Sequence, residues 1–184
     1  HQAWIPIHMT FWGWPFDQAV EAVVLREPEI AEVERQIDTY IRWKLEGEEN
    51  WRNANLYARA DYKDQRMGRV DLWEGQWPTG RTLVVERQTA RHYDIPVGST
   101  VIVQFGRREH RLEIVGIIRD SFAGPPQFGD DPAFFSTLET ATWLTGDDFN
   151  RIDVRLASYS GREDAQKVID RVAERIERVG MSIN

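Results

Sequence analysis

The chain has 184 residues, 41% of them hydrophobic, which suffices for one domain with a sizeable core or for two small lobes that share an interface. Its 30 acidic and 23 basic side chains give a net charge of −7, which argues against nucleic-acid binding because phosphate contacts need clustered Lys and Arg. The absence of cysteine excludes disulfides, thiolate metal sites and cysteine nucleophiles, and leaves the redox compartment open.

The first 16 residues are rich in aromatic side chains. Trp4 to Thr10 is predicted to be a strand, and Trp12, Trp14 and Phe16 follow it closely. Two interpretations remain open: these rings pack into the core, or they lie near a bilayer surface, where Trp is enriched. Under the second interpretation, Trp12, Trp14 and Phe16 are candidate membrane-proximal residues.

Three elements are predicted after this start. Asp17 can cap a helix that runs to about Leu25, before Pro28. From Ile30 to Leu45 apolar residues recur mostly two apart, which predicts a long half-buried strand. A turn then leads to a second alternating strand, Ala54 to Ala60. The polar segment from Asp61 to Trp77 is expected to hold one short helical turn.

Several elements are predicted one after another in the stretch from Gly75 to Asp120. A Gly- and Pro-rich turn precedes a strand, Thr82 to Val85, and a short helix, Gln88 to Tyr93. A hairpin follows, with arms at Thr100 to Phe105 and His110 to Ile118.

Ser121 to Pro132 contains two glycines and three prolines, so a loop is predicted there. Phe122, Gln127 and Phe128 are its candidate contacts for a partner or substrate, because exposed aromatic side chains in a loop are typical of interaction sites. The alternative is that both rings fold back and anchor the loop.

The last third of the chain predicts two helices around one strand. Ser136 and Glu139 have the spacing of a capping box for a helix through Leu144 that Gly146 can close. A strand is expected from Ile152 to Ala157. A second possible capping box, Ser160 and Glu163, then opens a helix whose apolar stripe consists of Ala165, Val168, Ile169, Val172, Ala173, Ile176 and Val179.

The order of elements between Gly75 and Asp120 resembles the extracytoplasmic core domain of MacB/FtsX-type ABC transporter permeases. The matching residues are Ala90 in the helix, Val97 and Gly98 at the turn, and the run Val115 to Ile117 at the hairpin end. Ser99 departs from the family pattern, which usually has an acidic residue after the turn glycine.

The resemblance implies an α+β fold with two lobes: residues 1–80 and 133–184 would form a βαβ-type porter-like lobe, and residues 81–132 an inserted β-rich lobe. It also implies a domain outside the cytoplasm, cut from a membrane protein. The implied partners are a cytoplasmic ABC ATPase acting through transmembrane helices, a second permease subunit, and an exported substrate or accessory protein.

No catalytic site is expected. The four histidines lie in unrelated predicted elements, and the acidic doublets lie in turns. No Gly-x-Ser-x-Gly elbow or phosphate-binding Gly-rich loop occurs, so neither a metal nor a cofactor is predicted. The alternative function from a different class is a secreted carbohydrate-binding or glycan-processing domain, which the many Trp and Tyr residues and the loop acids suggest.

Overall fold

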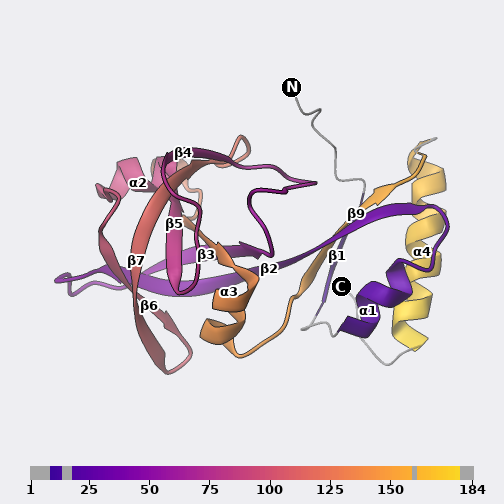
Figure 1. Ribbon diagram of the computed structural model, residues 1–184, viewed down its shortest axis with the longest axis horizontal. Coiled ribbons are helices and arrows are strands. Elements are labelled where there is room, and N and C mark those ends of the chain that lie inside the picture. Colours follow the sequence, from indigo (N-terminus) through magenta and orange to yellow (C-terminus); the bar gives the residue numbers. More distant parts are fainter. Residues whose placement is uncertain (1–8, 14–17, 159–160, 179–184) are drawn as a thin grey trace. The chain divides into compact units, whose positions relative to one another are not determined.

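A computed structural model describes residues 9–13, 18–158 and 161–178 (Figure 1). The chain divides into two compact units. Unit 1 comprises His1–Gln36, Arg66–Gly68 and Asp147–Asn184, and unit 2 comprises Ile37–Gln65 and Arg69–Gly146. Strand β2, Ile30–Leu45, belongs to unit 1 in its first part and to unit 2 in the rest. Strands and helices mix in both units, so the predicted α+β class is confirmed.

In its described residues, unit 1 contains a three-stranded antiparallel sheet and two helices. Strand β9 lies between β1 and the first part of β2, with Val154 opposite both Met9 and Val33. Helix α1 packs against α4, whose apolar stripe is buried at Ala165, Val168, Val172 and Ile176. The bounds are β1 Met9–Trp12, α1 Gln18–Val24, β9 Arg151–Leu156 and α4 Arg162–Arg178.

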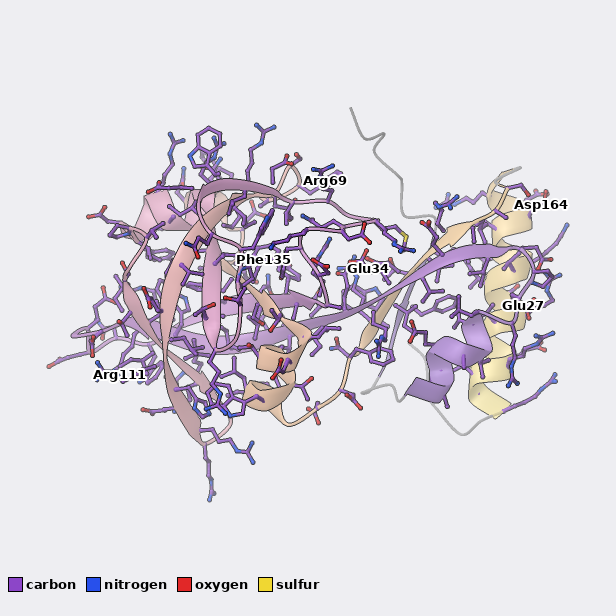
Figure 2. The ribbon with its side chains drawn as sticks, in the orientation of Figure 1. Glu27, Glu34, Arg69, Arg111, Phe135 and Asp164 are labelled. Carbon is purple, nitrogen blue, oxygen red and sulfur yellow. The ribbon has the colours of Figure 1, made fainter. Side chains whose placement is uncertain are left out.

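A buried carboxylate links two segments of unit 1. Glu27, which follows α1, is only 3% exposed and pairs with Arg171 and Arg175 on α4 (Figure 2). Burying an unpaired charge costs several kcal/mol. The ion pairs with these two arginines offset that cost for Glu27.

The strands of unit 2 close into a ring. The pairing runs from β2 through β3, β8, β5 and β7 to β6, and β6 pairs back with β2. Closure leaves these strands few free edges. The bounds are β3 Arg52–Arg59, β5 Thr82–Glu86, α2 Arg87–Tyr93, β6 Thr100–Phe105, β7 Arg108–Arg119, β8 Ala133–Thr137 and α3 Leu138–Thr145.

Aromatic side chains fill much of the interior of unit 2. Trp43 is fully buried and makes edge contacts with Tyr93 and Phe134, at centroid distances of 5.1 and 4.9 Å. A second buried cluster includes Phe135, which points into the unit in Figure 2, together with Tyr62 and Val84. Tyr62 stacks on Trp77 and donates a hydrogen bond to the Ser136 carbonyl at 2.7 Å.

Two local predictions were wrong. The segment from Asp61 to Trp77 contains a strand, β4 Asp71–Gly75, and no helical turn, because its residues pair with β7. Helix α3 is capped by Thr137 and not by Ser136: the Thr137 hydroxyl accepts the Thr140 N–H at 3.2 Å, while Ser136 is buried in β8.

The other predicted elements were confirmed where the structure describes them. The long strand has the expected bounds, and both hairpin arms, the helix after Thr82 to Val85 and the last helix are present. The start of the first predicted strand, Trp4 to His8, and the last residues of the chain lie outside the described residues.

Candidate contact surface

The segment between β7 and β8 places two phenylalanines in solvent. Phe122 is 77% and Phe128 82% exposed, and Gln127 between them is also exposed. The predicted exposure of both rings is therefore confirmed, and the alternative that they fold back as loop anchors is wrong. Whether they bind a partner stays a prediction.

The backbone that carries these rings is hydrogen-bonded. The Phe122 N–H donates to the Asp120 carboxylate at 2.9 Å. Gln127 and Phe128 belong to a short 3₁₀ helix, η1 Pro126–Phe128, in which the Phe128 N–H donates to the Pro125 carbonyl at 2.9 Å. Since η1 also packs against α2, both phenylalanines project from an ordered support.

Glu86 connects this support to the strand ring. It ends β5, is 2% exposed, and its carboxylate accepts the backbone N–H groups of Gln88 and Thr89 at the start of α2. The Thr89 hydroxyl in turn accepts the Ala133 N–H at 3.0 Å. Burial raises the pKa of Glu86 above its ordinary value, although these backbone donors oppose the shift.

Strand β4 adds two more exposed apolar side chains, Leu72 and Trp73, at 37% and 56% exposure. Leu72 and Glu74 lie opposite the consecutive residues Ile118 and Ile117 of β7, so Trp73 is the extra residue of a β-bulge. A bulge re-aims its side chain relative to the sheet. The Arg87 guanidinium covers the Trp73 ring at 4.7 Å.

Two glycines allow β4 to lie beside β7 (Figure 1). A Cβ atom on Gly116 would lie 2.2 Å from the Gln76 carbonyl oxygen, and one on Gly75 would lie 2.3 Å from the Val115 carbonyl oxygen. Any other residue at either position would push the strands apart.

The four exposed side chains lie around the start of α2 and the end of β7. Asp71 pairs with Arg119, and Phe122 is three residues past Arg119, within about 10 Å along the chain. Trp73 contacts Arg87, the first residue of the helix against which η1 packs. We call this set the aromatic surface: Leu72, Trp73, Phe122 and Phe128.

Leu72 and Trp73 were not among the candidate contact residues predicted from the sequence. The alternation of Val70 and Leu72 with polar neighbours, ended by Gly75, is typical of a short strand and was the available signal. The bulge that aims Trp73 depends on the pairing with β7, which no local pattern contains.

Of the candidate membrane-proximal residues, the structure describes only Trp12. It ends β1, is 39% exposed, and has the Arg151 guanidinium 5.0 Å from its ring. Trp14 and Phe16 lie outside the described residues.

Neither a metal centre nor a membrane-spanning helix is found in the described part of the chain. No three His, Asp or Glu side chains there are grouped so that they could hold a metal ion. None of the described helices is long and apolar enough to cross a membrane.

One family model matches the chain, and solved structures share its fold. The model of the MacB-like periplasmic core domain matches residues 6–172. The extracellular domain of the noncanonic ABC-type transporter YknZ from Gram-positive bacteria is similar in structure, with a TM-score of 0.64 and 11% identity over 95% of both chains.

The periplasmic region of MacB from Actinobacillus actinomycetemcomitans has a TM-score of 0.61 and 15% identity, over 95% of this chain and 86% of that one. At these identities the likeness shows the fold alone. No curated protein matches the chain. Because the family model covers most of the sequence, this chain belongs to the MacB-like periplasmic core domains, the extracytoplasmic domains of ABC transporter permeases, as the resemblance predicted.

Proposed function

We propose that this domain couples the motion of membrane helices, driven by a cytoplasmic ABC ATPase, to the release or export of a substrate or to contact with a partner. The domain itself is non-catalytic in this proposal, and the ATPase hydrolyses ATP. The partners are a second permease subunit and an exported substrate or accessory protein.

The observation that carries the proposal is the aromatic surface. Large apolar side chains that share one exposed region mark interaction sites, and Trp with a neighbouring Arg is typical of the residues that dominate binding energy. The supporting backbone is held by Glu86 and by η1, and it is attached to a closed ring of strands. A rigid body of this kind can transmit a displacement as a unit.

Two further assignments belong to this proposal. Residues 1–80 and 133–184 are assigned to the porter-like lobe, and residues 81–132 to the inserted lobe. Trp12, Trp14 and Phe16 are assigned to the membrane-proximal side of the domain.

Photo-crosslinking in the full permease with its ATPase tests the proposal. A photoreactive phenylalanine analogue at position 122 or 128 should give a crosslinked product whose yield changes when ATP is added. The same analogue at Tyr40, which is 66% exposed and lies in β2, outside the aromatic surface, is the matched control. Equal yields at all three positions, or no product at 122 and 128, would contradict the proposal.

Stability measurements separate a contact role from a structural one. Replacing both phenylalanines by serine, F122S/F128S, should leave the melting temperature of the domain nearly unchanged, because neither ring is buried. Phe135→Ala is the comparison, since it removes a buried ring and should cost about 3–5 kcal/mol. A large loss of stability in F122S/F128S would show that the loop rings are structural anchors.

A further inference from the structure

A second group of side chains lies at the other end of strand β5 from the aromatic surface. Arg81 directly precedes β5, whereas Glu86 ends it. Arg81 contacts Trp143 of α3, the same ring contacts His110 of β7, and Arg108 lies two residues before His110 in that strand. We call these four residues the arginine cluster.

The Arg81 guanidinium stacks on a ring of α3, and the Arg108 guanidinium lies near the C-terminal end of the same helix. The Arg81 guanidinium lies 4.1 Å from the centroid of the Trp143 ring, and the His110 ring lies 4.1 Å from the same centroid. The Arg108 Nη1 atom would be 3.8 Å from a Cβ on Gly146, which caps the C-terminus of α3. A guanidinium that stacks on a ring keeps its planar fork of N–H donors available at its edge.

Arg81 and Arg108 have no acidic partner in the described residues, unlike Arg52 and Arg111 of the same unit. Arg52 pairs with Glu48 and Arg111 with Glu46. Arg81 and Arg108 are both exposed, and neither forms an ion pair with any carboxylate in the described ranges.

The positive charges of Arg81 and Arg108 affect the neighbouring His110 side chain. Its Nε2 atom is buried and has no hydrogen-bond partner among the described residues. The pKa of His110 lies below its ordinary value because of burial and, to a smaller extent, because of Arg108 and Arg81. The geometry agrees with this, because Arg81 and His110 contact the same Trp143 ring, and Arg108 and His110 are two apart in β7 and so lie on one face of the strand.

We propose that the arginine cluster binds a phosphate group, with Arg81 and Arg108 donating to its oxygens. Two forked guanidinium groups suit an oxyanion of about two negative charges, since a single carboxylate would neutralise only one of them. The covered Nε2 of His110 does not touch the ligand in this arrangement. This proposal goes beyond the partner contact above and does not depend on it.

Inorganic phosphate is the probe, compared with chloride at the same ionic strength. Phosphate should raise the pKa of His110 in a saturable way, measured by NMR of the imidazole, with the resonance assigned from His110→Gln. Arg81→Ala and Arg108→Ala should each weaken phosphate binding about tenfold, as expected for one charge-assisted contact. Arg81→Lys should also weaken it, because Lys lacks the fork.

Arg111→Ala is the matched control, because it removes the same charge from the same strand but at a residue paired with Glu46 (Figure 2). Its phosphate affinity should change by less than about twofold. Equal losses in all three alanine variants would mean nonspecific attraction and would overturn the proposal, as would an unchanged His110 titration in phosphate.

Two further measurements identify the source of the phosphate group. Phosphatidylcholine vesicles with and without phosphatidic acid separate a lipid headgroup from a free phosphate: binding only with phosphatidic acid supports a headgroup, and binding of inorganic phosphate without vesicle binding supports a soluble ligand. A Glu-rich peptide that shifts His110 when phosphate does not would overturn the proposal in favour of an acidic partner.

Discussion

Glu86 is a buried carboxyl group at the point where β5 ends and α2 begins. Its folded pKa is raised by burial, whereas the unfolded chain has the ordinary value. At a pH below the ordinary pKa, Glu86 is protonated in both the folded and the unfolded state. Its raised pKa then does not lower the free energy of unfolding. Above the raised pKa it is ionised in both states, and the cost of burying the charge is present in full.

We therefore expect Glu86→Gln to gain stability relative to the wild type as the pH rises from about 4 to 7, because Gln keeps the acceptor oxygen without the charge. Urea unfolding of both proteins at the two pH values measures the difference. The other carboxylates contribute the same pH dependence to both proteins, so their contribution cancels in the comparison. A difference that is independent of pH would contradict this account of Glu86.

Asp153 is a buried carboxylate that is paired with a neighbouring cation, Arg151. It is fully buried in β9, accepts two hydrogen bonds from Arg151 at 2.8 and 2.9 Å, and accepts a third from the Thr10 hydroxyl of β1 at 2.9 Å. The hydrogen bond to Thr10 links strands that are distant in sequence.

Asp153→Ala should destabilise the chain by about 3 kcal/mol, because it leaves the largely buried Arg151 without this carboxylate. Glu174→Ala, which removes one partner of an exposed pair on α4, should stay within about 0.5 kcal/mol of the wild type. Denaturant unfolding measures both, and similar values for the two variants would show that burial does not matter here. The double variant with Arg151→Ala should lose less than the sum of the single changes.

At the scale of the element, the start of α3 depends on one hydroxyl. Thr137 ends β8 and caps the helix, and its oxygen lies 3.2 Å from the Thr140 nitrogen. Ser136 was the expected cap because Ser followed three residues later by Glu is the usual capping-box pattern. Strand β8 extends one residue further than that pattern implies, which shifts the cap by one position.

Thr137→Ala should cost about 1 kcal/mol of unfolding free energy, while Thr137→Ser should cost much less because it keeps the acceptor. Circular dichroism during urea unfolding measures both changes. Equal losses would mean that the methyl group, and not the hydroxyl, holds this end of the helix.

At the scale of the whole molecule, most strongly apolar stretches are buried within the two compact units. Strand β2 buries Ile30, Ile37 and Ile41, α4 buries one stripe, and the ring of unit 2 encloses Trp43 and Phe134. The resemblance to the permease domains also implies that both chain ends meet the membrane on one side of the domain. His1 and Asn184 lie outside the described residues, so this stays a prediction.

The isolated domain should therefore be a monomer, because an obligate interface needs a large apolar area and most apolar side chains that the structure describes are already buried within the two units. Light scattering at rising protein concentration measures this. A stable dimer at micromolar concentration that Trp12 and Trp14 substitutions dissociate would contradict the prediction and would move those tryptophans to a subunit interface.

The amino-acid sequence by itself determined the local elements of this protein. Alternation predicted the bounds of β2, a 3.6-residue period predicted α4, and Gly and Pro predicted the exposed loop that carries Phe122 and Phe128. These features follow from the conformational preferences of neighbouring residues, which a single sequence contains.

Only the tertiary structure decided which strands pair. Strand β6 closes the ring by pairing with both β2 and β7, and β4 lies beside β7 with Trp73 in a bulge. Arg81 and His110, which are distant in sequence, contact the same Trp143 ring. Such contacts depend on side-chain packing between strands and on the closure of long loops. Hydrophobic periodicity states only that a residue faces a core, and not which distant residue it meets there.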